Sequence, residues 1–274
     1  MKIQLLISTY NERIEQVEHI LLSPRDDLSY LVSHQCTKEE YRNIPQALIR
    51  PDVTIFQISG TGISANRNNS IRCANGDVVV LLDDDVRLQP DYIEAIRSIF
   101  KDHPEVDLAC CKIKTLDGEP EYKVYPVEEK VLHETGELKS ISSIEISFRL
   151  KSILDKNIWF DERFGLGRKA NNGEELLFLN ACLKSKLTIR YFPVFTVEHP
   201  FQSTTKNQPP YSDQTLFATG AQAYVLYGRM AFLRNYLAAV RRWKDLKREG
   251  VSVFHFIRMK QAGSMFICKG GKDY

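Results

Sequence analysis

The chain has 274 residues, of which 43% are hydrophobic and 26% are charged, enough apolar material for one large domain or for two subdomains that share a sheet. Lys and Arg number 37 against 35 Asp and Glu, so the whole-chain charge argues neither for nor against nucleic acid. No segment approaches the apolar run that spans a bilayer, and the opening residues look like a first strand rather than a signal peptide, so we expect a cytoplasmic protein.

Short β-rich runs alternate with helical stretches in the first part of the chain. The stretch after the first run has Ile14, Val17 and Leu21 at helical spacing. Strand–helix–strand alternation at roughly 25-residue spacing predicts a parallel sheet with crossover helices. The fourth run, VVVLL, is apolar throughout, which is typical of a central strand covered on both faces. The predicted strands are Ile3–Ser8, Tyr30–Ser33, Val53–Ile58 and Val78–Leu82.

Three further helices are predicted between and after these strands. Ser64 could cap the first, which would carry Ala65, Ile71 and Ala74 inward. The second begins at Pro90 and runs to about residue 100, because proline suits the first helical position and apolar residues follow on one face. The third runs from about residue 173 to 186, with Leu176, Leu179 and Leu183 inward. The strands of this part are Val106–Ile113, Ile144–Phe148, Thr188–Phe192 and Val194–Val197. We therefore predict an open α/β sheet that is doubly wound in its first half and extended by mixed strands in its second.

Three consecutive aspartates, Asp83, Asp84 and Asp85, directly follow the VVVLL strand. In open α/β sheets, ligands bind beyond the carboxyl ends of the strands. Because alternate side chains of an extended chain point the same way, Asp83 and Asp85 can share one face while Asp84 points elsewhere. Two converging carboxylates repel each other unless a cation compensates them. Mg²⁺ or Mn²⁺ suits this role, since hard cations take oxygen ligands and keep positions for substrate phosphates.

Three segments in order, LLISTYNER, GTGISANRNNSIRCANGDVVVLLDDDV and FGLGRKANNGEELLFL, resemble the bacterial family 2 glycosyltransferases of the GT-A fold. The resemblance covers roughly residues 1–200. It implies a Rossmann-like open mixed sheet with helices on both faces. It also implies inverting transfer of a sugar from a nucleotide-sugar to an acceptor hydroxyl, with the divalent cation bridging the donor diphosphate.

The resemblance also implies which residues contact the donor. Asp83 would approach the ribose or donor sugar together with Asp84, and Asp85 would hold the metal with Asp83. The other donor-side residues that the resemblance implies are Thr9, Tyr10, Glu12 and Gln35 for base and ribose. The family more usually has an aspartate where Gln35 stands. Arg67 suits either the diphosphate or the aspartate cluster, since guanidinium binds phosphate and carboxylate oxygens alike.

An inverting transfer needs a carboxylate that takes the proton of the attacking hydroxyl. Glu174 and Glu175 resemble the family's Glu-Asp pair, whose second residue is the base, and this favours Glu175. On the acceptor side, the FGLG loop contributes Gly165 and Gly167, and Trp159 could form a wall for a sugar ring or belong to the core. His199 follows a strand; it either completes the metal shell, as in some related enzymes, or is structural.

The chain from Arg229 onward has 11 Lys/Arg and 3 Asp/Glu, a local balance of +8. Met230, Leu233, Leu237 and Val240 form an apolar stripe at helical spacing among these cations. Such a helix could lie on an anionic membrane surface or pack on the catalytic body with a solvated basic rim.

These observations predict a nucleotide-sugar-binding half at 1–104, an acceptor-binding and catalytic half of the same domain at 105–228, and a basic helical extension at 229–274. We expect a metal-dependent inverting hexosyl- or hexosaminyltransferase, with UDP as donor nucleotide and a glycan or lipid-linked glycan as acceptor. It would build capsular or other surface polysaccharide in the cytoplasm, at the inner face of the plasma membrane, without nucleic acid. The alternatives are a metal-dependent nucleotidyl or phosphoryl transferase, which lacks its phosphate-cradling loop here, and a nucleic-acid-binding protein, for which no motif occurs.

Overall fold

The computed structural model describes residues 1–202 and 209–271. The chain folds into two compact units that do not follow the linear order of the sequence. The first comprises Met1–Thr61, Ala65–Phe160 and Phe178–Phe201, and the second comprises Gly62–Ser64, Asp161–Leu177 and Gln202–Tyr274. The division predicted from the sequence, with boundaries at residues 104 and 228, separates parts of the chain by their function. It stays a prediction.

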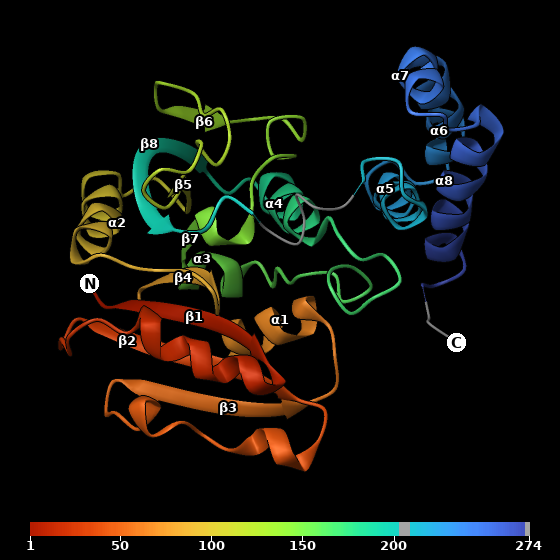
Figure 1. Ribbon diagram of the computed structural model, residues 1–274. Helices are drawn as coiled ribbons and strands as arrows, with labels where there is room; N and C mark the ends of the chain where they lie inside the picture. The colour runs from red at the N-terminus through yellow and green to blue at the C-terminus, as the bar shows by residue number, and fades with distance from the viewer. Residues whose placement is uncertain (203–208, 272–274) are drawn as a thin grey trace. The chain divides into compact units, whose positions relative to one another are not determined.

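The first unit is built on a mixed sheet with the strand order β3-β2-β1-β4-β7-β5-β8-β6 in the described part of the chain (Figure 1). Its first half is parallel, as the strand–helix alternation predicts. This half consists of β1 (Ile3–Tyr10), β2 (Leu28–Cys36), β3 (Val53–Ser59) and β4 (Val78–Asp83). The VVVLL residues of β4 are buried throughout, which confirms a central strand.

The second half of the sheet is mixed. β7 (Ile146–Arg149) runs antiparallel to both β4 and β5 (Leu108–Lys114). β8 (Ile189–Glu198) runs parallel to β5 and antiparallel to β6 (Lys130–Leu132). The two strands predicted around Pro193 are one strand, because β8 shifts its register against β5 there and a bulge accommodates the residue that has no N–H to donate. The predicted open α/β fold with mixed strands is confirmed.

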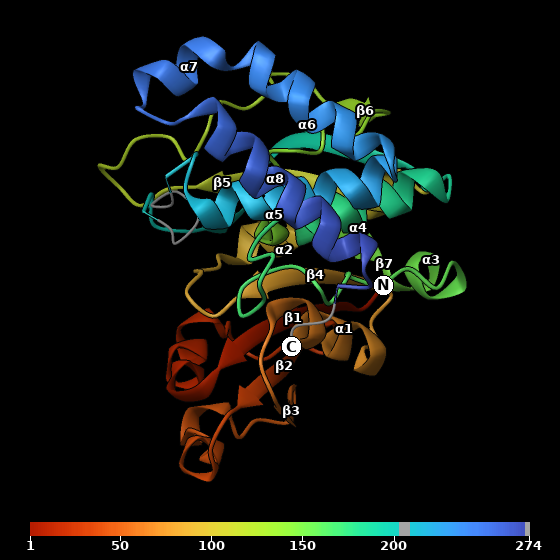
Figure 2. The same ribbon diagram turned by 90° about the vertical axis from the view of Figure 1, so that its right-hand side faces the viewer.

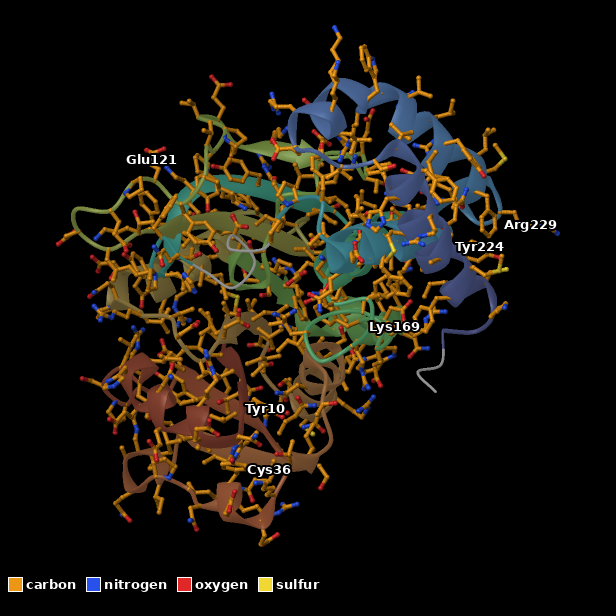
Figure 3. All side chains as sticks on the ribbon, turned by 45° about the vertical axis from the view of Figure 1, so that its right-hand side comes forward. Tyr10, Cys36, Glu121, Lys169, Tyr224 and Arg229 are labelled. Atoms are coloured by element: carbon orange, nitrogen blue, oxygen red, sulfur yellow. The ribbon has the colours of Figure 1, made fainter. Side chains whose placement is uncertain are left out.

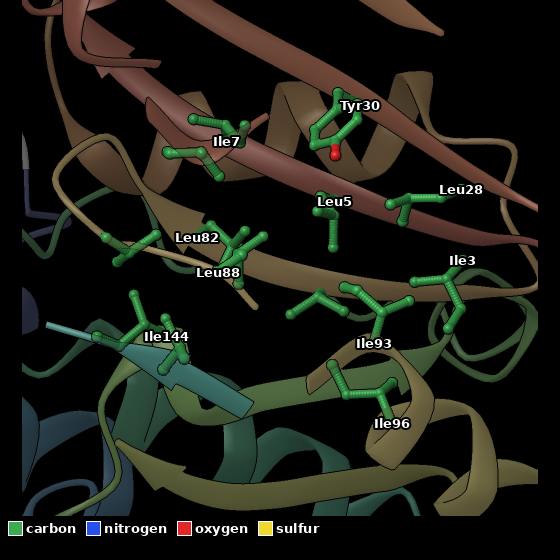
Figure 4. Close-up of a cluster of buried hydrophobic side chains, with 14 of the residues drawn as sticks. Ile3, Leu5, Ile7, Leu28, Tyr30, Leu82, Leu88, Ile93, Ile96 and Ile144 are labelled. Carbon is green, nitrogen blue, oxygen red and sulfur yellow. The ribbon is translucent and has the colours of Figure 1, made fainter. Parts of the chain in front are cut away.

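The hydrophobic core of the first unit lies between the sheet and its helices. Figure 4 shows Ile3 and Ile7 of β1, Leu82 of β4, and Ile93 and Ile96 of α2 (Pro90–Asp102) in this cluster. All five side chains are at most 2% exposed. The predicted helix with its apolar face toward the sheet is therefore confirmed for α2.

The stretch after β1 is a 3-10 helix, Asn11–Ile20, rather than an α-helix. With three residues per turn, its inward positions are Ile14, Val17 and Ile20, all buried. Leu21, the third residue at helical spacing, lies just after the helix and packs, partly buried, against the core.

The next helix, α1 (Ile63–Cys73), buries a polar face. Ser64 lies inside the helix and donates to the carbonyl oxygen of Phe164, so the prediction that it caps the helix was wrong. Ala65 is only half-buried, whereas Asn66 and Asn68 are 1% and 2% exposed. Buried amides need hydrogen-bond partners, and these link α1 to its neighbours: Asn66 donates to the carbonyl of Thr9.

Helix α4 (Glu174–Lys184) follows the predicted course. Of the three leucines predicted inward, Leu179 is buried, whereas Leu176 and Leu183 are only half-buried. The other buried residues include Leu177, Phe178 and Cys182. Phe178 stacks on Phe160 with ring centroids 4.3 Å apart. Phe160 therefore belongs to the core. The remaining short helices of the first unit are α3 (Leu150–Asp155) and the 3-10 helices Glu39–Arg42, Gln46–Leu48 and Ser143–Glu145.

The second unit contains α5 (Asp213–Tyr227), α6 (Met230–Arg241), α7 (Trp243–Arg248) and α8 (Val253–Cys268), which follow one another in Figure 2. α5 and α8 approach each other closely: a Cβ built on Gly263 would lie 1.9 Å from the carbonyl oxygen of Phe217. The backbones meet because glycine has no side chain to separate them. Within the described residues, none of the helices has the length and the hydropathy to cross a membrane.

Candidate functional site

The acidic triplet lies where the strand order reverses. β1 is flanked by β2 and β4, both parallel to it, and Ser8 pairs with Asp83. The carboxyl ends of β1 and β4 are thus at a topological switch point, the position at which open α/β sheets bind ligands. The side chains of Asp83 and Asp85 are 37% and 41% exposed, whereas that of Asp84 is 5% exposed. This is the alternation expected of residues that continue a strand.

Asp84 is held from two sides inside the first unit. The hydroxyl of Thr9 donates to Asp84 Oδ2 at 2.7 Å, and Arg13 Nε lies 2.9 Å from Asp84 Oδ1. Arg13 Nη2 also contacts Asp84 and lies 3.1 Å from Asp85 Oδ2. Burial raises the pKa of Asp84, while the hydrogen bonds from Arg13 and Thr9 act in the opposite direction. The carboxylate of Asp84 accepts from Thr9 and Arg13, and its contact with the nucleotide-sugar stays a prediction.

Arg13 was not among the predicted site residues. Its hydrogen bonds to Asp84 raise its pKa, so the guanidinium stays charged. The sequence does hold one signal for it: Arg13 is the basic residue of the segment STYNER and lies three positions beyond the end of β1. Its acidic partners lie about seventy positions later in the chain, and no local pattern identifies them.

Asp85 has a second partner, His199. The loop after the triplet is tied to the end of β8 by two backbone hydrogen bonds of 2.9 Å between Arg87 and Glu198. This bridge brings His199 Nε2 to 3.4 Å from Asp85 Oδ1. Burial alone would raise the pKa of Asp85, but the hydrogen bond and charge of His199 and the charge of Arg13 outweigh burial and lower it.

The pair of Asp85 and His199 fits a divalent cation. His199 Nδ1 lies 2.6 Å from the carbonyl oxygen of Pro200, so we assign the proton to Nδ1 and the lone pair to Nε2. A carboxylate oxygen and an imidazole lone pair that face each other need a proton or a cation between them. Burial lowers the pKa of His199, but the bonds to Asp85 and Pro200 raise it more, so protonation of Nε2 competes with metal. In the described part of the chain, no third Asp, Glu, His or Cys completes a metal-binding group with them.

Asp83 pairs with Arg67. Arg67 Nη2 lies 3.2 Å from Asp83 Oδ1 and 2.7 Å from the hydroxyl of Ser143, and its guanidinium lies over the ring of Phe160. Arg67 is only 4% exposed. From the sequence, the diphosphate and the aspartate cluster were both considered as partners of Arg67, and the structure shows its contact with the aspartate cluster.

The other predicted donor-side residues lie at the same edge of the sheet. Tyr10 ends β1 and pairs in register with Gln35 of the neighbouring strand, and Tyr10 and Cys36 mark the two strand ends in Figure 3. Tyr10 is 39% exposed and Gln35 is 3% exposed. Glu12 is exposed on the first turn of the 3-10 helix.

A small cavity of about 60 Å³ lies beside the second half of the sheet. Its wall includes Tyr122, whose ring meets that of His199 edge-on at 5.7 Å between centroids. The cavity is therefore next to His199, the partner of Asp85. Its lining combines aromatic rings with charged groups: Lys112, Ile113, Lys114, Thr115, Glu121, Tyr122, Tyr125 and Phe195.

The predicted base belongs to the second unit. Glu174 and Glu175 form the first turn of α4; Glu174 is 5% exposed and Glu175 is half-buried. A Cβ built on Gly165, which has φ +96°, would lie 2.5 Å from Ile63 Cγ2 and 3.0 Å from Glu174 Cδ. The loop therefore packs on Glu174, while Glu175 keeps contact with solvent. Gly167 is exposed with φ +83° in the same loop.

The predicted acceptor-side residue Trp159 lies in the first unit. It is half-buried beneath the guanidinium of Arg72, 5.1 Å from its ring centroid, and it donates to Asn157. The structure leaves part of the ring accessible and does not bury it in the core as it buries Phe160.

Comparison with known proteins places these residues in a family context. The family model of Glycosyl transferase family 2 matches residues 5–161. The glucosyl-dolichyl phosphate glucuronosyltransferase of Haloferax volcanii is 27% identical over 112 residues, 38% of this chain. That alignment spans only 36% of the relative's own length.

Solved structures of S. aureus TarS resemble the chain over most of its length. The crystal structure of TarS 1-349 has a TM-score of 0.58 at 15% identity. The same fragment in complex with UDP-GlcNAc has a TM-score of 0.59 at 14% identity. Both alignments cover 98% of this chain and 92% of TarS 1-349. At these identities the likeness shows the fold.

Proposed function

The chain belongs to glycosyl transferase family 2, and from this premise we propose that it transfers a hexose or hexosamine from a UDP-sugar to an acceptor hydroxyl with inversion. The acceptor would be a glycan or lipid-linked glycan of a capsular or other surface polysaccharide, at the inner face of the plasma membrane. The choice of UDP is supported by TarS, a structural neighbour that was solved with UDP and with UDP-GlcNAc. Family membership favours neither the nucleotidyl transferase nor the nucleic-acid-binding alternative.

The observation that carries the proposal is the pairing of Asp85 with His199 at the carboxyl ends of β4 and β8. A carboxylate and an imidazole would hold Mg²⁺ or Mn²⁺ on one side, and diphosphate oxygens would complete its coordination. When bound, the cation supplies charge stabilisation for the departing diphosphate. Asp83, kept in place by Arg67, would contact the ribose or donor sugar, and Thr9, Tyr10, Glu12 and Gln35 would line the nucleotide side.

Glu175 would take the proton of the attacking hydroxyl. A general base must reach its substrate, and Glu175 is the more accessible of the two glutamates. Its position in the first turn of α4 favours the carboxylate over the carboxylic acid, because helix N-termini stabilise negative charge. The buried Glu174 would instead fix the loop that contains Gly165 and Gly167, and Trp159 would offer a ring to the acceptor.

Thermal unfolding of the full chain with nucleotides and nucleotide-sugars, each with and without Mn²⁺, tests the proposal. UDP and a UDP-sugar should raise the Tm, and only with the metal, because a ligand that binds the folded state stabilises it by mass action. Asp85→Ala should abolish the metal-dependent shift. Glu175→Gln should keep the shift and lower sugar transfer by at least about 100-fold.

Asp91→Asn, a change of an exposed carboxylate on the first turn of α2, is the control and should alter neither property. Normal turnover by Glu175→Gln would exclude Glu175 as the base. If UDP leaves the Tm unchanged both with and without Mn²⁺, UDP is excluded as the donor nucleotide.

A further inference from the structure

Helix α6 exposes its large apolar side chains. Met230, Leu233, Leu237 and Val240 are 59%, 53%, 46% and 69% exposed. They follow one another at intervals of three and four residues, so they form one stripe along the helix. Trp243, the first residue of α7, is 52% exposed just beyond this stripe. We call these five residues the α6 stripe. Large apolar residues that gather on one exposed face mark an interaction site.

The opposite face of α6 fixes this orientation. The buried residues of the helix are Ala231, Asn235 and Ala239, which are small or polar. Asn235 Nδ2 donates to Ser264 Oγ of α8 at 2.9 Å, and both side chains are at most 1% exposed. Turning the helix to bury the stripe would separate the buried Asn235 amide from Ser264 and cost this hydrogen bond. The stripe therefore faces outward because the inner face is specified by other contacts.

The segment that contains the α6 stripe is rich in cations. Residues 229–249 contain seven Lys/Arg and two acids. Both acids, Asp245 and Glu249, pair with Arg248 at 3.2 and 3.4 Å. Arg229 stands at the junction of α5 and α6 in Figure 3, and Arg234 stacks on Tyr227 with its guanidinium 3.8 Å from the ring centroid. The remaining cations of this segment are Arg241, Arg242, Lys244 and Lys247.

We propose that α6 and the start of α7 dock on an anionic lipid surface, with the α6 stripe inserted among the acyl chains and the cations at the phosphate level. Amphipathic helices with this distribution lie in the plane of a bilayer interface. Tryptophan favours that interface, and juxtamembrane cations are attracted to anionic lipids. A second copy of the chain fits less well, because a symmetric contact would place one cationic rim against another. The inference deepens the proposed location at the membrane and depends on no donor-site residue.

Flotation of the full chain with vesicles tests the inference. Vesicles of phosphatidylcholine with about 30% phosphatidylglycerol should bind the protein at least about ten-fold more tightly than phosphatidylcholine alone, and salt should weaken the binding. The double variant Leu233→Ser, Val240→Ser should lose at least about ten-fold in affinity because it removes apolar insertion. The double variant Arg241→Glu, Arg242→Glu should lose as much because it reverses the charge.

Val124→Ser with Val127→Ser is the matched control, since these valines are 95% and 89% exposed outside the α6 stripe. This control should bind vesicles like the wild type. Far-UV circular dichroism and the UDP-induced Tm shift, measured on every variant, separate loss of membrane binding from loss of fold or donor site. Unchanged binding by the stripe variant, or binding that ignores lipid charge, would overturn the inference. Self-association that the stripe variant abolishes, without vesicle binding, would overturn it in favour of a second copy.

Discussion

Arg13 pairs with two of the three consecutive aspartates. Its guanidinium contacts Asp84 with both Nε and Nη2 and reaches Asp85 at 3.1 Å. Like charges in a row repel one another, and the buried Asp84 could not stay ionised without a cation beside it. At the scale of single residues, Arg13 therefore holds the acidic triplet in place, while Asp85 Oδ1 faces His199.

Arg13→Ala is expected to lower the free energy of unfolding by about 1–3 kcal/mol, because it leaves a buried carboxylate without its charged donor. Urea denaturation measures this loss. Arg13→Lys should lose less, since it keeps the charge but not the two-point contact.

The double variant Arg13→Ala, Asp84→Asn, compared with the two single variants, measures the interaction energy between these two side chains. The neutral amide no longer needs a cation, so the second substitution should cost less in the Arg13→Ala background than in the wild type. If the losses of unfolding free energy in the two single variants add up to the loss in the double variant, the contact between Arg13 and Asp84 contributes nothing to stability.

At the scale of elements, the closest packing in the second unit is between α5 and α8. A Cβ on Gly220 would lie 2.0 Å from the carbonyl oxygen of Lys260, and Gly263 meets Phe217 in the same way. The buried hydroxyl of Ser264 donates to the carbonyl of Gly220 at 2.7 Å. The two helices pack backbone to backbone, and this contact positions α6 through Asn235.

Gly263→Ala is expected to destabilise the protein by about 1–3 kcal/mol in thermal or urea unfolding, because the added methyl group forces the two helices apart. Alanine favours an isolated helix over glycine by about 1 kcal/mol, which offsets only part of this loss. Gly136→Ala is the control, since a Cβ at Gly136 meets nothing within 4 Å. A stable Gly263→Ala variant would show that the helices separate without loss.

At the scale of the whole molecule, the basic C-terminal part is not a detachable extension. α8 contributes Phe256 and Ile267 to the apolar clusters that also contain Leu216 and Phe217 of α5. The charge boundary near residue 229 therefore does not coincide with a boundary of packing. The second unit also takes in residues 161–177, so its fold needs segments that are far apart in the chain.

Truncation after residue 228 is accordingly expected to expose the apolar face of α5. The Tm should fall by at least about 5 °C, with increased aggregation, because several large side chains lose their partners. Circular dichroism melts and light scattering measure both effects. The double variant Leu233→Ser, Val240→Ser of the α6 stripe should stay soluble. It is therefore a better test of membrane binding than the truncated chain. A truncated chain with wild-type Tm and solubility would contradict the packing described for α8.

Much of the first unit was predictable because its signals are local. The apolar run of β4, the proline that starts α2 and the alternation of strands and helices each depend on neighbouring residues, and the structure confirms them. The errors have local causes too. A 3-10 helix has a different spacing from an α-helix, so Ile20 is fully buried and Leu21 only partly. The buried polar face of α1 follows no hydrophobic period.

The sequence by itself determined that an acidic triplet ends a central parallel strand and that an amphipathic basic helix lies near the C-terminus. Periodicity and strand-end position are properties of short segments, so they can be read without partners. Only the tertiary structure decided that Arg13 holds Asp84, that His199 meets Asp85 and that the α6 stripe faces outward. These outcomes depend on contacts between residues distant in the chain, which local patterns do not specify.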